Sequence, residues 1–527
     1  MTSIVLSDWL AQRLTRDGEQ PLYRQLHGLL QQAILTHTLA PGSKLPSSRM
    51  LADELALARN TVTNVYEQLA LEGYVETTRG SGTYVMDTTV DDIAGVEARG
   101  GVPGVSEGWA ATTAATAATA TTAGAKTRGT KAPPAPPPES ERGGGLSSRG
   151  QRLVSAAGAS NRQWGAFVPG VPDVTAFPAR IWSRLQNQYW RRPRAELMTY
   201  STGGGYAPLR QALADYLRTA RSVRCAPEQI IITTGIHQSI DLAVRLLSDV
   251  GDVVWTEDPC YWGVRSVLQS SGLQMRPILV DGEGINPSAA DLSAPPKLIL
   301  VTPSHQYPLG MVMSLARRRM LLEYARRTQS WIIEDDYDSE FRYASRPLAS
   351  LQGLDTAGQV IYVGSLGKIL YPGLRIGYLV VPEAQVDNFA IALAELYREG
   401  QLVQQAVLAD FIEQGHFTSH IRRMRNAYGA RRQLLMDAIA SRLGEPLPVL
   451  GDEAGLHLVA RLPDTVSDKL VAREALTAGI ATRPLSTYFS DSTHAPRGLL
   501  LGYACVADEA IRPSFDTLAN VIERYLN

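Results

Sequence analysis

Cysteine, long apolar runs and an excess of charge of either sign are all scarce in this chain. Its 527 residues include three cysteines, which are far apart and lack the spacing of metal-ligand motifs. A chain of this length can bury a large core without disulfides, so the sequence predicts free thiols in a reducing compartment. No apolar stretch approaches the roughly 18 residues that span a bilayer, and no secretory leader pattern opens the chain. We therefore expect a cytoplasmic protein with no membrane partner.

The global charge points to no partner either. The formal net charge is -1 and the sequence pI is about 6.7. Any binding of nucleic acid must therefore depend on a local surface. The composition, 44% hydrophobic and 20% charged, is typical of globular proteins, and the length predicts two to four domains.

The N-terminal residues predict three helices and a small hairpin. Apolar residues at helical spacing predict a helix over residues 21–38. A second helix follows the capping serines at 47 and 48, and a third is expected from the cap Asn60 to Gly73. Two short strands at 74–77 and 82–85 surround a tip and would form a wing. Two helices joined by a short turn match helix-turn-helix geometry.

In that geometry the third helix enters a DNA major groove, and the second helix and the wing touch the flanking backbone. The candidate DNA-binding residues are Arg49, Arg59, Asn60, Thr61, Thr63, Arg79 and Gly80. Residues 1–87 contain seven Lys or Arg and nine Asp or Glu, a net charge of -2, so no basic patch supports this interpretation. A small protein-interaction module is the alternative.

The order of short motifs in this region closely resembles the GntR-type winged helix-turn-helix. The motifs are Pro41-Gly42, Leu45 to Arg49, Arg59 to Val62, Glu72 to Tyr74, and Gly80 to Thr83. The resemblance implies an α+β DNA-binding domain over residues 13–87 and a homodimer bound to a two-part operator. It assigns DNA contact to the positions that are Arg49, Arg59, Thr61 and Gly80 here.

Residues 88–150 differ in composition from the rest. They contain Ala-Thr repeats, then a proline run, then three consecutive glycines. Few large apolar residues are present to offset the entropy of ordering, so we expect a disordered or semi-extended linker. A flexible chain of this length would span roughly 40 Å or somewhat more. An inert tether is favoured over a recognition site for a proline-binding partner.

From residue 151 to the end, apolar strand-like runs alternate with helical stretches. Val- and Ile-rich runs begin near residues 230, 253, 298, 331 and 360. This alternation predicts an α/β domain with a largely parallel sheet, whose ligands bind beyond the carboxyl ends of the strands. Polar residues gather at those ends. The candidate site residues are Gly235, Ile236, His237, Tyr261, His305, Gln306, Asp335, Tyr337, Ser365, Lys368 and Arg375.

Each residue type in this set suits one part of a flat, phosphorylated, carbonyl-bearing ligand. Lys368 follows a buried strand in an irregular segment, residues 364–373, where burial can deprotonate an amine that then forms a Schiff base. The turn from Gly235 to Gln238, between a strand and the helix expected from Ser239, favours a phosphate, as do Ser365 and Arg375. Asp335 belongs to a run of carboxylates that repel one another unless a cation binds.

Each position also has a simpler interpretation. Lys368 could be a solvated loop lysine, Tyr261 could simply pack, and His305 with Gln306 could be structural or donate hydrogen bonds to a ligand. The cation at the carboxylate run could be a metal, although a protonated pyridine nitrogen is the favoured choice.

With the preceding module, these segments resemble the MocR or GabR subfamily of GntR regulators, whose fold type I aminotransferase-like domain depends on pyridoxal phosphate. The resemblance implies that Lys368 forms the Schiff base, Asp335 pairs with the pyridine nitrogen and Tyr337 bonds the ring hydroxyl. Asp336 is the alternative to Asp335, because two adjacent aspartates leave the register open. Tyr261 would stack on the ring. Ser365, Arg375 and the turn from Gly235 to His237 would bind the phosphate.

The chain departs from its relatives in two places. Gly367 precedes the lysine where relatives commonly have serine. Gly263 and Thr487 stand where GABA-responsive relatives have arginines, and Arg265 or Arg483 could substitute for them. The identity of the effector therefore stays open.

The combination of parts predicts a cytoplasmic regulator, nucleoid-associated when bound to operator DNA. We expect it to sense an amino compound, or pyridoxal phosphate itself, through the Schiff-base lysine. Two alternatives remain. One is an active aminotransferase with an accessory DNA-binding domain, and the other is a regulator whose aminotransferase-like domain only dimerises.

Overall fold

The computed structural model describes most of the chain outside the predicted linker. The described residues are 3–15, 22–35, 38–40, 42–71, 74–78, 82–85, 145–155, 164–201, 203–343, 349–398, 400–444, 447–451 and 453–526. Residues 88–144 of the predicted linker, and Arg79 and Gly80 of the predicted wing tip, lie outside them. The chain forms two compact units, an N-terminal one and a larger C-terminal one.

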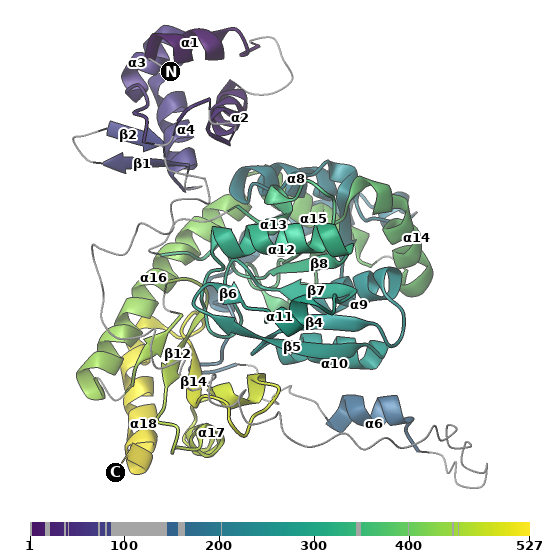
Figure 1. The fold of residues 1–527 in the computed structure, drawn as a ribbon, viewed down its shortest axis with the longest axis vertical. Helices are drawn as coiled ribbons and strands as arrows, with labels where there is room; N and C mark the ends of the chain where they lie inside the picture. Colours follow the sequence, from purple (N-terminus) through teal and green to yellow (C-terminus); the bar gives the residue numbers. More distant parts are fainter. Residues whose placement is uncertain are drawn as a thin grey trace. The chain divides into compact units, whose positions relative to one another are not determined.

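The N-terminal unit contains the predicted helices and hairpin. Its elements are α1 (Ser3–Ala11), α2 (Leu22–Leu35), α3 (Ser48–Leu55), α4 (Arg59–Leu71), β1 (Val75–Thr78) and β2 (Gly82–Val85). Strands β1 and β2 are antiparallel, with Thr78 opposite Gly82 (Figure 1). Leu26 and Leu30 of α2 are buried together with Val62 and Leu69 of α4. This apolar core holds the helices in the arrangement that the sequence predicts.

Local hydrogen bonds set the helix ends and differ from the prediction at one of them. The Ser47 hydroxyl accepts a hydrogen bond from the amide of Met50 at 3.2 Å, so Ser47 is the N-cap of α3 as predicted. Helix α4 begins one residue earlier than predicted, at Arg59. The Thr61 amide already donates to the Ala58 carbonyl at 2.9 Å, which places Asn60 in the first turn rather than at the cap. Helix α1 was not predicted, because its residues are largely apolar with little periodicity.

The C-terminal unit is built on an eight-stranded sheet of order β3-β10-β9-β8-β7-β4-β5-β6. The strands are β3 (Ile230–Thr233), β4 (Val253–Asp258), β5 (Gln274–Asp281), β6 (Gly284–Ile285), β7 (Leu298–Val301), β8 (Trp331–Asp336), β9 (Val360–Ser365) and β10 (Gly377–Val380). Strands β5, β4, β7, β8 and β9 run parallel, whereas β10 is antiparallel to both β9 and β3. The prediction of a largely parallel sheet is confirmed. Strand β9 continues two residues beyond its predicted end, through Gly364 and Ser365.

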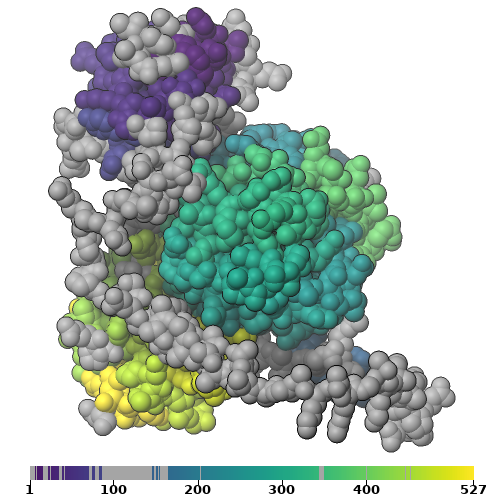
Figure 2. All heavy atoms as spheres, viewed as in Figure 1, coloured from purple at the N-terminus to yellow at the C-terminus, as the bar shows by residue number. Residues whose placement is uncertain are grey.

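Helices cover both faces of this sheet. The helices between residues 148 and 413 include α6 (Ser148–Ser155), α7 (Ala179–Arg191), α8 (Ala207–Ala220), α9 (Ile236–Leu247), α10 (Trp262–Ser271), α11 (Ala289–Leu292), α12 (Leu315–Thr328), α13 (Leu351–Leu354), α14 (Val386–Tyr397) and α15 (Leu402–Glu413). Residues 217–220 of α8 and 351–353 of α13 are grouped with the N-terminal unit. Adjacent residues of β4 point to opposite faces, as a strand requires. Val254 belongs to the apolar cluster that includes residues of α9, α10 and α14, whereas Trp255 stacks on Tyr324 of α12 with ring centroids 5.2 Å apart. Figure 2 shows teal atoms packed continuously over much of the viewed face of this unit.

A smaller four-stranded sheet follows towards the C-terminus. Its strands are β11 (Val449–Leu450), β12 (His457–Arg461), β13 (Arg483–Pro484) and β14 (Gly498–Gly502), all antiparallel in the order β11-β12-β14-β13. Helices α16 (His416–Arg442), α17 (Asp468–Thr477) and α18 (Asp508–Leu526) pack on it, and α16 lies beside α18 (Figure 1). Among the described residues, none of the helices is long and apolar enough to cross a membrane.

Candidate functional site

The predicted site residues lie at or just beyond the ends of five strands, at one edge of the large sheet. These are the carboxyl ends of β3, β4, β7, β8 and β9. Strand β3 shares this direction, because both it and β9 are antiparallel to β10. Segments that are up to about 130 residues apart in the sequence therefore deliver their polar side chains to the same edge.

Lys368 follows β9 in a tight turn and points into the unit. Its Nζ donates a hydrogen bond to the carbonyl oxygen of Gly170 at 2.5 Å. Gly170 has φ +70°, a backbone conformation that favours glycine, and a Cβ at that position would lie 2.9 Å from the Lys368 Nζ. Burial lowers the pKa of Lys368, while the nearby charges of Asp338 and Asp335 act in the opposite direction. These surroundings match a reactive amine better than a solvated loop lysine.

The two adjacent aspartates at the end of β8 have different environments. The Tyr362 hydroxyl donates to Oδ2 of Asp336 at 2.5 Å. Oδ1 of Asp335 is buried without a hydrogen-bond partner among the described residues, and so is Oδ1 of Asp336. Burial, and then the charges of Asp336 and Asp338, raise the pKa of Asp335 to about 8. A cation opposite Asp335 would offset these effects, so the geometry favours Asp335 over Asp336 as the partner of a protonated ring nitrogen.

A metal is less well supported as the cation at this carboxylate run. Within the described ranges, no cluster of three or more His, Cys, Asp or Glu side chains has the arrangement of a metal site.

Aromatic rings form one wall of the site. The ring of Tyr261 lies parallel to that of His237, with centroids 5.9 Å apart and planes at 11°. On its other side, Tyr307 meets Tyr261 edge-on at 5.6 Å and also meets Tyr337 edge-on at 5.6 Å. Tyr488 of the smaller sheet region lies 5.5 Å from Tyr307. Sequence reasoning identified Tyr261 and Tyr337 but assigned no role to Tyr307 or Tyr488.

The residues predicted to bind the phosphate include those at the N-terminus of α9. Gly235 is the N-cap residue, with φ +118°, and a Cβ built on it would lie 3.8 Å from a guanidinium nitrogen of Arg375. Arg375 is exposed and has a left-handed backbone, with φ +51°. Burial lowers the pKa of His237, and the charges of Arg375 and Lys368 lower it further. Helix-end amides and these two cations together provide the positive potential that a phosphate dianion requires.

Gln306 and His305, which were predicted to contact the cofactor, both form hydrogen bonds within the protein. The Gln306 side-chain amide donates to the carbonyl oxygens of Pro259 and Tyr307 at 2.8 and 2.9 Å, and its oxygen accepts from the Leu309 amide at 3.1 Å. Its hydrogen bonds therefore hold the turn rather than reach towards a ligand. His305 is buried, and its Nδ1 lies 2.9 Å from the Tyr337 hydroxyl. Its Nε2 is buried without a hydrogen-bond partner among the described residues.

The two candidate arginines also differ in their contacts. The Arg265 guanidinium donates to the carbonyl oxygens of Thr487 and Phe489 at 2.7 and 3.1 Å, so it braces that segment. Arg483 is half-buried on β13, and its charge acts on Lys368 and Tyr261. Of the two, Arg483 is the one placed to influence the reactive amine.

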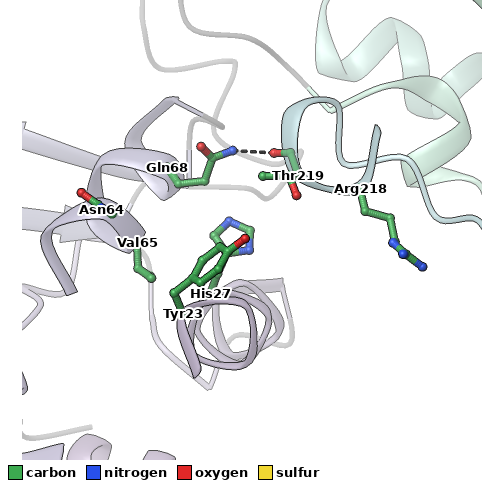
Figure 3. A pocket seen from close by; sticks show the side chains of 7 residues that line it. All are labelled: Tyr23, His27, Asn64, Val65, Gln68, Arg218 and Thr219. Carbon is green, nitrogen blue, oxygen red and sulfur yellow. Dashed lines mark hydrogen bonds between the residues drawn. The ribbon is translucent and has the colours of Figure 1, made fainter. Parts of the chain in front are cut away.

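In the N-terminal unit, the predicted DNA-binding residues lie at exposed helix ends. Arg49 of α3 and Arg59 and Asn60 of α4 are exposed, and Thr61 and Thr63 are half-buried. The opposite side of α4 packs in the module. Figure 3 shows Val65 and Gln68 of α4 on the side that faces Tyr23 and His27 of α2. The start of α4 is thus presented to solvent, as a recognition helix requires.

Comparison with known proteins gives both parts of the chain a family. Residues 22–85 match the model of bacterial regulatory proteins of the gntR family, and residues 182–497 match aminotransferase class I and II. The chain is 37% identical over 513 residues to the probable rhizopine catabolism regulatory protein MocR of Rhizobium meliloti, covering 96% of this chain and 94% of that protein. It is 30% identical over 494 residues to the pyridoxine biosynthesis transcriptional regulator PdxR of Corynebacterium glutamicum, covering 93% of each.

Among solved structures, the C-terminal unit resembles aminotransferases. A kynurenine aminotransferase of Pyrococcus horikoshii is similar with TM-score 0.64 and 26% identity, over 73% of this chain and 96% of that one. The α-aminoadipate aminotransferase LysN of Thermus thermophilus has TM-score 0.62 and 25% identity, over 72% and 95%. The first is a complex with PMP and the second a complex with N-(5'-phosphopyridoxyl)-L-leucine. The amine, acid and aromatic groups at the sheet edge fit a cofactor of this kind.

The N-terminal and C-terminal matches occur in one order on one chain, and full-length relatives share that order. The cofactor of the C-terminal domain is pyridoxal phosphate. The chain belongs to the MocR-type family of transcriptional regulators, in which a GntR helix-turn-helix domain precedes a fold type I aminotransferase-like domain.

Proposed function

We propose that this regulator changes its affinity for operator DNA when a primary amine reacts at the site around Lys368. The observation that carries the proposal is the half-buried Lys368 amine, on which the charges of Asp338 and Asp335 act, in a chain that also has a DNA-binding domain. The regulator would act as a homodimer on a two-part operator, through Arg49, Arg59, Asn60, Thr61 and Thr63. The wing residues Arg79 and Gly80 belong to the same proposed surface.

Each residue of the site would have a separate task. Bound pyridoxal phosphate supplies an aldehyde carbon that condenses reversibly with primary amines. Lys368 would hold that carbon, and Asp335 would stabilise the protonated ring nitrogen by charge. Tyr261 would cover the ring face, and Tyr337 would hydrogen-bond the ring oxygen. Ser365, Arg375 and the N-terminus of α9 would bind the phosphate.

Signalling would follow from an exchange of amines. The effector nitrogen would replace the Lys368 nitrogen on the aldehyde carbon, and Lys368 would leave as a free amine. A ligand can shift a conformational equilibrium only through different contacts with its two states. The released Lys368 amine and the newly bound effector provide such differences, and they would alter how the two DNA-binding domains of a dimer are presented.

The effector would be a primary amine that also carries an acidic group. Gly263 and Thr487 offer no positive charge, and the donors of Arg265 that face the 487–489 segment are bonded to backbone carbonyls. Arg483 is half-buried beside the tyrosine wall, where its charge acts on Tyr261, Tyr307 and Lys368. Arginine suits a carboxylate in general, because a guanidinium can form two parallel hydrogen bonds with it.

Substitution of Arg483 by glutamine should selectively weaken the binding of effectors that carry an acidic group. We expect 3-aminopropanoate to bind about 10- to 100-fold more weakly to Arg483→Gln, because a charge-assisted pair is lost. Propylamine, which lacks the acid, should bind with unchanged affinity. The measurement is a titration of the visible spectrum of purified protein with each amine. Arg473→Gln, an exposed substitution on α17, is the matched control. Equal weakening of both amines would contradict the assignment.

A working aminotransferase is the second candidate, because solved aminotransferases share the fold of the C-terminal unit. The two functions differ in turnover. We expect an amino donor to shift the spectrum once, and operator affinity to change with it. When the donor and an acceptor keto acid are both present, no more than about one equivalent of the donor's own keto acid should form. Keto acid produced over many cycles at a rate near 1 to 10³ per second would instead identify an enzyme.

A further inference from the structure

A buried histidine–aspartate pair lies directly behind Tyr337 and has no part in the roles given above. His305 is 2% exposed and Asp338 is 1% exposed. Nδ1 of His305 lies 2.9 Å from Oδ1 of Asp338 and also 2.9 Å from the Tyr337 hydroxyl. One ring nitrogen therefore meets a carboxylate and a phenol at the same time.

The chemistry of the three groups determines where the protons lie. An ionised carboxylate only accepts hydrogen bonds, so the Nδ1 atom carries a proton and donates it to Asp338. The same N–H also lies within hydrogen-bond distance of the Tyr337 oxygen, which can accept it. The phenolic proton of Tyr337 is then directed away from His305. Burial, and next the charge of Asp338, raise the pKa of Tyr337, which keeps that proton on the phenol.

The smaller sheet region keeps this pair in place. A Cβ on Gly455, whose φ is +83°, would lie 2.1 Å from Cε1 of His305 and 2.7 Å from Oδ2 of Asp338. The Gly455 amide donates to the Phe341 carbonyl at 2.7 Å, and the Gly455 carbonyl accepts from the Tyr503 hydroxyl at 2.8 Å. The imidazole and the carboxylate therefore lie against the Gly455 backbone, whose amide and carbonyl are both hydrogen-bonded. Only glycine allows this close approach.

We propose that His305 and Asp338 are positioning residues that orient the Tyr337 hydroxyl as a hydrogen-bond donor towards the ring oxygen of the cofactor. The proposal rests on the function proposed above, and it assigns the pair no contact with the cofactor. Donation from Tyr337 stabilises negative charge on the ring oxygen. In the cofactor-loaded protein, the ring oxygen would otherwise share a proton with the Lys368 nitrogen. Loss of the Tyr337 donor would make the negative ring oxygen less stable, so this shared proton would be lost only at a higher pH.

The test is the pH midpoint of the visible absorbance of purified, cofactor-loaded protein without effector or DNA. Tyr337→Phe should raise the midpoint by about one pH unit, and His305→Leu should raise it by a similar amount. The double variant should show no further rise, because His305 acts through Tyr337. Other charged groups that act on Lys368, namely Asp335, Asp338 and Arg483, are unchanged in all three proteins.

Two further variants separate orientation from loss of a buried ring. His305→Asn keeps a donor near the position of Nδ1, so its shift should be less than half that of His305→Leu. His457→Asn is the matched control, because the His457 imidazole is also buried but its Nε2 lies 3.1 Å from the Pro308 carbonyl oxygen. It should leave the midpoint within about 0.3 of a unit.

Additive shifts of His305→Leu and Tyr337→Phe would overturn the proposal, as would equal shifts for His305→Leu and His305→Asn. Failure of the proposed function would look different. The absorbance titrations would keep the expected pattern, while amines would leave operator binding unchanged.

Discussion

Lys368→Ala should abolish the response of DNA binding to amines, while operator binding without effector stays within about twofold of the unsubstituted protein. The substitution removes the side-chain nitrogen whose release the proposed mechanism requires. Visible absorbance from that link should also be lost, although pyridoxal phosphate can still bind through Arg375, Ser365 and the α9 N-terminus. The response is measured as the change in operator affinity between zero and saturating effector, and we expect a change of tenfold or more to fall to about onefold.

Two controls make the result specific. Lys368→Arg keeps a positive charge near Asp335 and Asp338 but cannot form the link, and it should behave like Lys368→Ala. Lys297→Ala removes an exposed lysine from the same unit and should respond normally. A Lys368→Ala protein that switches as well as the unsubstituted chain would refute the amine-exchange mechanism. It would favour a domain that serves only for dimerisation.

Arg59→Ala should weaken operator binding by about 10- to 100-fold, since each well-placed arginine contact to a base contributes about 1–3 kcal/mol. Arg59 is exposed in the first turn of α4, the helix expected to enter the major groove. The DNA probe is the sequence that purified protein selects from a random pool. Affinity is measured for that sequence and for a scrambled one.

The pattern of losses tells what Arg59 contacts. Reading of a base predicts that only the selected sequence loses affinity. Contact with a phosphate predicts equal losses on both sequences and a smaller dependence on salt. Arg13→Ala has the same change of charge in the same unit, and the Arg13 guanidinium donates to the Trp9 carbonyl near the end of α1, so it serves as the control. Losses as large in Arg13→Ala as in Arg59→Ala would show that net charge, not the α4 surface, governs binding.

The positions of the site residues along the chain could be predicted, because they follow recognisable strands. Val- and Ile-rich runs locate the strand ends, and parallel strands bring their carboxyl ends together. Lys368, Asp335 and the turn after β3 are predictable in this way. The two domain types could be predicted for a similar reason, since each is indicated by short motifs of neighbouring residues in a fixed order.

The orientation of individual side chains depends on residues that are distant in the sequence. The side chains of Asp335 and Asp336 point to opposite faces of β8. The Tyr362 hydroxyl, on the neighbouring strand β9, bonds Asp336, which leaves Asp335 as the better candidate to pair with the ring nitrogen. Lys368 meets the carbonyl of Gly170, 198 positions earlier in the sequence. No local pattern reports such contacts.

Glycine explains the error at the end of β9. Gly364 reads as a turn signal in the sequence, but it lies within the strand opposite Tyr378. A Cβ there would fall 2.2 Å from the Tyr378 ring, so the glycine serves close packing rather than a turn.

The buried Oδ1 of Asp335 has a thermodynamic consequence for the whole C-terminal unit. A buried polar atom without a partner among the described residues costs the fold about 1–3 kcal/mol. A ligand that supplies a proton donor at that atom binds the folded chain and not the unfolded one. At one hundred times its dissociation constant, such a ligand stabilises the native state by about 2.7 kcal/mol. The cellular supply of pyridoxal phosphate would then set how much of this regulator stays folded, independently of any effector.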